Sequence, residues 1–342
     1  MSTFIIAEAG VNHNGSLDTA LAMVDAAVQA GADAVKFQTF KAERLVTKTA
    51  AKAEYQIENT GAGESQSDML KRLELSPKMH RELFSYCSEK NIIFMSTPFD
   101  EESANMLNDL EMEIFKVPSG EITNKQLLQH IAAKGKEIIL STGMSFLEEV
   151  GKAVSWINEA WSGTEKKPHL TLLHCVSSYP ADVEDSNLLA MKTMEEAFGF
   201  PVGYSDHTLG TEVAVAAVAI GAKVIEKHFT LDRNMDGPDH RASLEPDELR
   251  SMVTAIRNIE KAIGDGVKKP VKSEEDARMV VRRSLVAKKD LKSGDTITPD
   301  DLEIKRPGTG IPPEFNGTVP GMHVKKDIKA DSIIRWEDLK DA

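Results

Sequence analysis

The stretch VGYSDHTLGTEVAVAAVAIGAKVIEKHFTLDRNMDGPDHR, residues 202–241, holds one complete repeat of the unit from which most of the chain is built. A short apolar run at 202–207 is followed by an Ala/Val-rich helical segment at 211–220 and a β-branched run at 223–229. A helix that joins two neighbouring strands makes them parallel. Both strands should therefore end at the same edge of one sheet.

The same strand and helix alternation runs through the first three quarters of the chain. Apolar runs of strand length lie at 4–10, 34–39, 92–98, 114–120, 137–143, 170–176, 202–207 and 223–229. Amphipathic helical segments lie at 17–30, 77–90, 101–110, 124–134, 146–161, 187–198, 211–220 and 246–264. A doubly wound open sheet would alternate in the same way, but a count of eight units favours an α/β fold of the (β/α)8, or TIM barrel, type.

The pattern changes after residue 264. The segment 266–280 is typical of a linker, and from residue 281 short strands and turns follow, with Gly, Pro and Asp every few residues and no helical period. We therefore expect a TIM-barrel catalytic domain at 1–265, a linker at 266–280 and a small, mostly β domain at 281–342.

Composition excludes several classes of protein. The formal charge of −13 argues against a nucleic-acid or anionic-membrane partner, and there is no apolar run long enough to span a bilayer. The N-terminal MSTFIIAEAG has no basic segment before its short apolar run, which favours a strand over a signal peptide. Cys87 and Cys175 have no CxxC spacing, which argues against structural zinc and fits a reducing compartment. A cytoplasmic location is expected.

Polar side chains follow almost every predicted strand, at the barrel end where active sites form. These residues are Glu8, Lys36, Gln38, Ser96, Thr97, Lys116, Ser119, Glu121, Ser141, Thr142, Ser177, Tyr179, Ser205, His207, Glu226 and His228. Lys36 and Lys116 are the most informative, because a lysine that points into a barrel is costly unless it meets an anion. The alternative is a lysine whose stem is buried and whose charge reaches water, and any one hydroxyl can be a helix N-cap.

Two histidines end neighbouring predicted strands. Because strand side chains alternate, Ser205 and His207 share one face of their strand, as do Glu226 and His228 of theirs. A single histidine is more often a hydrogen-bonded core or surface residue. Two at equivalent strand ends, followed by Asp239 in GPDH, favour a metal site instead.

This set of residues suits a phosphorylated substrate and a divalent metal that polarises a carbonyl group. One alternative is Schiff-base chemistry with Lys116 or Lys227 as the nucleophile. The two histidines disfavour it, since an imine mechanism needs no metal. Another alternative is a non-catalytic sugar-binding protein, which the many polar residues at the barrel rim disfavour.

Nine motifs, taken in order, resemble those of the sialic acid synthase family, bacterial enzymes that condense phosphoenolpyruvate with an N-acetylmannosamine-type sugar. They are IIAEAGVNHNG, AVKFQTF, STPFD, FKVPSGE, LSTGM, YSDH, IEKHFT, GPDH and KRPGTG. The resemblance covers essentially the whole chain. Its C-terminal part looks like the antifreeze-like (SAF) domain of that family.

The resemblance implies a role for each matching residue. His207 and His228 match the ligands of a metal that is typically manganese, with Mg²⁺ or Co²⁺ as alternatives. The phosphoenolpyruvate site matches Lys36, Thr97, Lys116, Ser119, Ser141 and Ser205, and Ser177 stands where some members have Asn. Residues around the sugar and the metal-bound water match Glu8, Gln38, Glu121, Tyr179 and Asp239, with Glu8 or Glu121 expected to transfer protons.

The resemblance also implies a domain-swapped homodimer. Arg306, in KRPGTG, matches an arginine that the antifreeze-like domain of one subunit inserts into the barrel of the other, next to the N-acetyl group of the sugar. The expected reaction joins phosphoenolpyruvate, open-chain N-acetylmannosamine and water to give N-acetylneuraminate and phosphate, with C–O cleavage. The alternative acceptor is 2,4-diacetamido-2,4,6-trideoxymannose, which gives legionaminate. The deciding contacts are expected in the connections 40–75 and 230–245.

Overall fold

The structure is a computed structural model that describes residues 2–61, 63–162 and 168–341. The chain divides into two compact units, Met1–Gly264 and Asp265–Ala342. Each unit has its own hydrophobic core. The two units are described separately.

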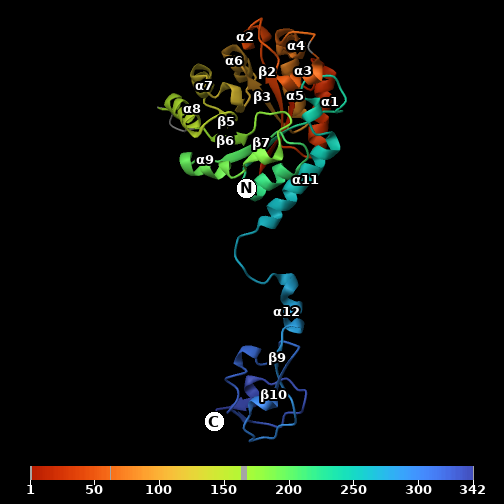
Figure 1. Ribbon diagram of the computed structural model, residues 1–342, viewed down its shortest axis with the longest axis vertical. Coiled ribbons are helices and arrows are strands. Elements are labelled where there is room, and N and C mark those ends of the chain that lie inside the picture. The colour runs from red at the N-terminus through yellow and green to blue at the C-terminus, as the bar shows by residue number, and fades with distance from the viewer. Residues whose placement is uncertain (1, 62, 163–167, 342) are drawn as a thin grey trace. The chain divides into compact units, whose positions relative to one another are not determined.

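The first unit is a closed barrel of eight parallel strands, in which each strand pairs with the next and β8 closes on β1. Figure 1 shows several of these strands with helices around them. The strands are β1 (Phe4–Gly10), β2 (Ala34–Thr39), β3 (Ile93–Pro98), β4 (Ile114–Val117), β5 (Glu137–Ser141), β6 (Leu170–Cys175), β7 (Val202–Asp206) and β8 (Val224–His228). The predicted TIM barrel is confirmed.

Helices surround the barrel. They are α1 (Leu17–Ala30), α5 (Pro77–Glu89), α6 (Glu101–Asp109), α7 (Lys125–Ala132), α8 (Leu147–Ala160), α9 (Ala190–Phe198), α10 (Glu212–Ala219) and α11 (Pro246–Ile263). Side chains of Ser16, Ser76, Asp100 and Asn124 accept hydrogen bonds from first-turn N–H groups, which fixes four of the helix starts. Each helix then buries one apolar face against the strands.

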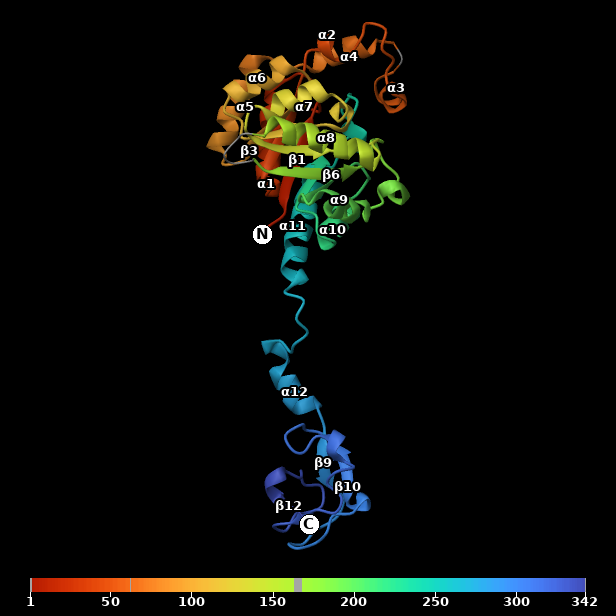
Figure 2. The ribbon, with the colours of Figure 1, turned by 90° about the vertical axis from the view of Figure 1, so that its left-hand side faces the viewer.

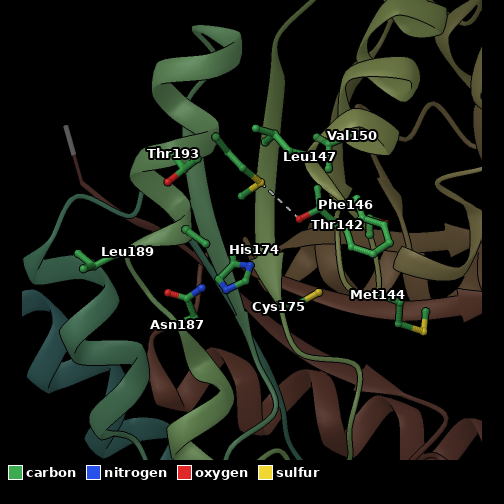
Figure 3. A pocket seen from close by; sticks show the side chains of 13 residues that line it. Thr142, Met144, Phe146, Leu147, Val150, His174, Cys175, Asn187, Leu189 and Thr193 are labelled. Atoms are coloured by element: carbon green, nitrogen blue, oxygen red, sulfur yellow. Dashed lines mark hydrogen bonds between the residues drawn. The ribbon is translucent and has the colours of Figure 1, made fainter.

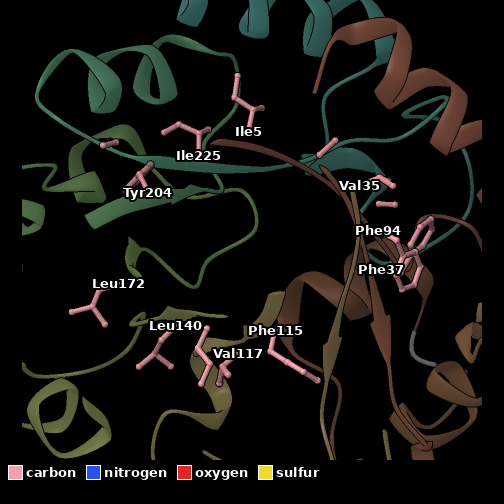
Figure 4. Close-up of a cluster of buried hydrophobic side chains, with 14 of the residues drawn as sticks. Ile5, Val35, Phe37, Phe94, Phe115, Val117, Leu140, Leu172, Tyr204 and Ile225 are labelled. Carbon is pink, nitrogen blue, oxygen red and sulfur yellow. The ribbon is translucent and has the colours of Figure 1, made fainter. Parts of the chain in front are cut away.

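Alternation along the strands separates the two faces of the barrel. Outward side chains such as Val35, Phe115 and Ile225 pack beneath the helices in the main core (Figure 4). Inward side chains form a smaller cluster that includes Ile6 and Met95. Above that apolar layer the inward positions become polar, so the interior ends in a charged site.

The connection after β2 contains helices that the sequence did not predict. It contains three short helices, α2 (Ala42–Leu45), α3 (Glu54–Thr60) and α4 (Gln66–Leu73), which lie together at one end of the barrel (Figure 2). Their sequences are short and mostly polar, so they carry almost no apolar period. The Ser65 side chain caps α4, and Met69 and Leu73 anchor it in a small cluster with Val11.

Two predicted strands end two or more residues early in the structure, because their last residues turn away from the sheet. The strand predicted at 114–120 ends at Val117, and a 3-10 turn follows at Ser119–Glu121. The strand predicted at 137–143 ends at Ser141. The polar residues just after these strands therefore lie on loops at the barrel rim.

The second unit is mostly β, as predicted. Antiparallel β9 (Ser284–Ala287) and β10 (Leu302–Lys305) form one pair, and β11 (His323–Val324) and β12 (Leu339–Lys340) form another. The segment predicted as a linker, 266–280, contains most of a helix, α12 (Glu275–Val281). In the part of the chain that the structure describes, none of the helices could cross a membrane.

Candidate active site

Strands β1, β2 and β8 place three predicted residues at one level of the barrel interior. Glu8 lies opposite Lys36 on one side and opposite His228 on the other. The Lys36 ammonium lies 2.8 Å from Glu8 Oε2 and 3.5 Å from Glu226 Oε2, and it donates to Thr97 Oγ1 at 2.9 Å. The charge of this lysine therefore does not reach water, because Glu8, Glu226 and Thr97 hold the ammonium group inside the barrel.

Glu226 joins the two lysines. Its Oε1 lies 3.5 Å from Lys116 Nζ and accepts a hydrogen bond from Ser205 Oγ at 2.8 Å. The sequence places Glu226 on the same strand face as His228, yet gave no reason to assign it a role. Its partners depend on the pairing of β8 with β7 and on the closure of the barrel, which one sequence does not reveal.

Burial and charge set the protonation of this cluster. Burial raises the pKa of Glu8 above its usual range, and the opposing effect of Lys36 is smaller. Burial would also raise the pKa of Glu226, but Lys116 and Lys36 outweigh it and hold that pKa low. Two ammonium groups thus face one firmly ionised carboxylate and a Glu8 that tends to keep its proton, an arrangement that favours a bound anion.

Hydroxyl groups extend the cluster on the side of β5 and β6. Ser141 Oγ is buried without a hydrogen-bond partner among the described residues. Ser119 Oγ accepts from the Gly143 N–H at 2.9 Å. A Cβ at position 143 would collide with Ser177 Oγ. Only glycine therefore lets the side chains of Ser119 and Ser177 lie against the backbone at this position. These hydroxyls supply hydrogen-bond donors beside the two lysines.

The two histidine rings lie side by side, with centroids 5.6 Å apart. His207 Nδ1 must be the donor to the Val176 carbonyl at 2.6 Å, so its Nε2, 3.3 Å from Ser205 Oγ, keeps a lone pair. His228 Nδ1 is buried without a hydrogen bond among the described residues. Burial lowers the pKa of both imidazoles, which keeps them neutral. Neutral imidazoles, one oriented by a carbonyl, are ligands that divalent metals take.

Asp239, Tyr179 and Gln38 surround the histidines. Asp239 Oδ2 lies 4.0 Å from His228 Nδ1, and burial raises the pKa of this carboxyl to about 6. The ring centroids of Tyr179 and His207 lie 4.2 Å apart. Gln38 Nε2 donates to Glu8 Oε1 at 3.4 Å. Within the described ranges, no group of three or more His, Cys, Asp or Glu residues has the arrangement of a complete metal site.

Two further predicted residues have other surroundings, Glu121 in the first unit and Arg306 in the second. The Glu121 carboxylate accepts a hydrogen bond from Asn124 Nδ2 at 2.7 Å, at the start of α7, whereas the Glu8 carboxylate contacts Lys36 directly. Arg306 belongs to the second unit, where it precedes Pro307 in a cis peptide. Its predicted contact with the sugar stays a prediction.

The structure also bears on the Schiff-base alternative. Lys227 points to the outer side of the barrel, where its ammonium lies 2.8 Å from Asp206 Oδ2 in a fully buried pair. It therefore lies on the face of β8 opposite to the inward-facing Glu226. Lys116 does face the interior, but it lies next to Glu226 in the anion cluster.

Two cavities lie at this end of the barrel. One, of about 610 Å³, lies between α8 and α9 and is lined by neutral residues such as Phe146, Leu189 and His174 (Figure 3). Since no lysine or carboxylate lines it, it does not offer the chemistry of the charged cluster. The other, of about 300 Å³, includes Tyr179, His228 and Asp239 and opens beside the histidines.

Known proteins resemble this chain over its whole length. It is 50% identical over 333 residues to an N,N'-diacetyllegionaminic acid synthase of Campylobacter jejuni, covering 97% of this chain and 99% of that protein. It is 48% identical over 340 residues to the N,N'-diacetyllegionaminic acid synthase of Legionella pneumophila, covering 99% of this chain and 95% of that one. The crystal structure of an N-acetylneuraminic acid (sialic acid) synthetase from Leptospira borgpetersenii is 39% identical, with a TM-score of 0.70 over 81% of this chain and 90% of that one.

Family models agree with these similarities. The NeuB family model matches residues 23–268, which cover the barrel, and the SAF domain model matches residues 282–340 in the second unit. The family and the C-terminal SAF domain expected from the nine motifs are thereby confirmed. The chain belongs to the NeuB family.

Proposed function

We propose that this chain is an N,N'-diacetyllegionaminic acid synthase. It joins phosphoenolpyruvate, 2,4-diacetamido-2,4,6-trideoxymannose and water, and releases phosphate. The observation that carries the proposal is the identity of 50% and 48%, over nearly the full length, to two synthases of that product, against 39% to the sialic acid synthetase. This acceptor replaces N-acetylmannosamine, which the sequence favoured, as the main proposal.

The charged cluster supports phosphoenolpyruvate as the second substrate. Lys36 and Lys116 are both buried, and each lies within 3.5 Å of a carboxylate oxygen of Glu226. A phosphate or carboxylate group that enters between them gains two charge-assisted contacts. Ser141 and Ser205 are also buried and add hydroxyl groups to this end of the barrel. Ser119, Ser177 and Thr97 complete the proposed anion site.

His207 and His228 fit a divalent ion, since both are neutral and His228 Nδ1 is a buried nitrogen without a described partner. We propose Mn²⁺ for this position, with Mg²⁺ or Co²⁺ as alternatives. When bound, such an ion would polarise the aldehyde oxygen of the open-chain sugar. Asp239 and Tyr179 lie beside the two rings and would orient the sugar there.

Glu8 is the stronger of the two candidates for proton transfer. As C3 of phosphoenolpyruvate bonds to the aldehyde carbon, the aldehyde oxygen gains a proton, and the water that adds at C2 loses one before the C–O bond to phosphate breaks. The Glu8 carboxyl lies between Lys36 and Gln38 in the barrel interior and has a raised pKa. Its position and its raised pKa suit it to serve as the acid.

Phosphate release from phosphoenolpyruvate with Mn²⁺ tests the proposal. The two acceptors, N-acetylmannosamine and 2,4-diacetamido-2,4,6-trideoxymannose, are compared at equal concentrations. We expect kcat/KM to be larger for the diacetamido sugar by a factor of about 10 or more. Turnover with N-acetylmannosamine alone would assign the chain to N-acetylneuraminate synthesis, and turnover with neither would require another acceptor.

A further inference from the structure

The cavity of about 300 Å³ beside His228 is lined by two chemically different groups of side chains. The first group is polar and consists of Gln38, Tyr179, His228 and Asp239. The second group is an apolar wall, contributed by the segment after β2 and its neighbours: Val11, Leu45, Val46, Met69, Leu70, Leu73 and Phe99. Tyr55, Gln56 and Gln66 of the same segment also line the cavity. A ligand in this cavity can therefore contact both His228 and the apolar wall.

The segment that forms this wall is fixed to the barrel. Asn59 Nδ2, on α3, donates to the Pro238 carbonyl at 2.6 Å, which joins it to the connection 230–245. The Tyr55 ring packs at 5.3 Å from the ring of Tyr179. A Cβ at Gly15 would collide with the Arg72 carbonyl, so α4 lies directly against the loop after β1. The wall thus has a defined position relative to the site.

The apolar wall should favour one of the two candidate sugars, because burying a methyl group there is favourable and burying a hydroxyl group is not. Met69 and Leu73 are almost completely buried, in one cluster with Val11 and Phe40. A hydroxyl group in contact with the apolar wall loses water and gains no hydrogen bond from these side chains, which costs free energy, whereas a methyl group gains by being buried. The diacetamido sugar carries a methyl at C6 and a second acetamido methyl, where N-acetylmannosamine carries hydroxyls.

We infer that the acceptor sugar binds in this cavity and that Val46 and Leu70 contact its C6 and C4 substituents, so that these two residues determine which sugar is preferred. The inference rests on the proposed function, since it assumes that the aldehyde end lies at His228. Gln56 and Gln66 line the same cavity and supply side-chain amides for the polar part of the second acetamido group. Selectivity for the 6-deoxy sugar is then a property of the segment after β2.

The test is Val46→Thr, which keeps the shape of the side chain and replaces a methyl with a hydroxyl. A second variant, Leu70→Gln, places an amide on the same wall. We expect each to lower the ratio of kcat/KM for the diacetamido sugar to kcat/KM for N-acetylmannosamine by about tenfold or more, with the KM for phosphoenolpyruvate unchanged. The control is Ile57→Thr, because Ile57 is exposed and does not line the cavity; its ratio should equal that of the wild type.

The outcomes separate the inference from the proposed function. If the wild type uses the diacetamido sugar and both variants keep its selectivity ratio, the subsite lies elsewhere and only the inference is overturned. An equal loss with both sugars also overturns it, because general damage does not select between substituents. If the wild type does not use the diacetamido sugar, the proposed function itself fails. Both positions are only partly buried, and Val46→Thr keeps the volume of the side chain, so the variants should fold.

Discussion

Glu226 lies in the motif IEKHFT, but its role in the site becomes visible only from its contacts. It is 4% exposed, and it lies within contact of Lys36, Lys116 and Ser205. Without an anion, its charge is the firmly ionised counter-charge for two buried ammonium groups. Substrate binding therefore exchanges part of one internal ion pair for another, which limits the desolvation cost of taking up a polyanion.

Glu226→Gln tests this role. Removal of the charge leaves two buried ammonium groups with too little compensation, so we expect the free energy of unfolding to fall by about 3–5 kcal/mol. Inorganic phosphate should raise the Tm of the variant more than that of the wild type, since the anion replaces the lost carboxylate. Thermal and denaturant unfolding, with and without phosphate, measure both effects.

The matched control for this change is Glu113→Gln, just before β4, where the carboxylate pairs with Lys136 at the surface. Exposed ion pairs contribute little, so its stability should stay within about 0.5 kcal/mol of the wild type. If Glu226→Gln behaved like Glu113→Gln, and phosphate affected all three proteins equally, Glu226 would not be the counter-charge of the lysines.

At the scale of elements, apolar periodicity predicted what depends on local sequence and missed what depends on pairing. The barrel strands and the long helices fall within a few residues of their predicted bounds, because each buries a continuous apolar face. The short helices α2, α3 and α4 were missed, since they are stabilised by caps and by contacts with distant residues such as Val11. The predicted strand ends were enough to place His207 and His228 as neighbours. The role of Glu226 became clear only from the pairing register of β8 with β7 and β1.

One prediction concerns the binding of a metal ion at the ends of β7 and β8. Because His207 and His228 are the proposed protein ligands, His207→Ala should weaken Mn²⁺ binding by about tenfold or more. Electron paramagnetic resonance of free Mn²⁺ during titration of metal-stripped protein measures this without substrate. His130→Ala, on α7 beside Asn105, is the control and should bind Mn²⁺ like the wild type. Equal affinity in all three proteins would exclude His207 as a ligand.

At the scale of the whole molecule, the barrel and the SAF domain have separate cores, so each can tolerate change without unfolding the other. The sequence predicted both units because they differ in period: a barrel repeats strand and helix, whereas the second unit repeats strand and turn. Arg306 is the predicted link between them. Whether it serves the barrel of its own chain or that of a second copy depends on assembly, which neither core determines.

Complementation between two inactive variants tests whether Arg306 serves the barrel of its own chain or that of a second copy. We expect Arg306→Ala and Lys116→Met each to lack activity, because one loses the proposed sugar contact and the other an anion-site lysine. In a domain-swapped homodimer, a mixed dimer holds one barrel with Lys116 that receives Arg306 from its partner. Co-expression of the two variants should then restore about a quarter of wild-type activity, since half of the dimers are mixed and each has one complete site. If each site is built within one chain, every site in the mixture carries a defect, and co-expression restores nothing.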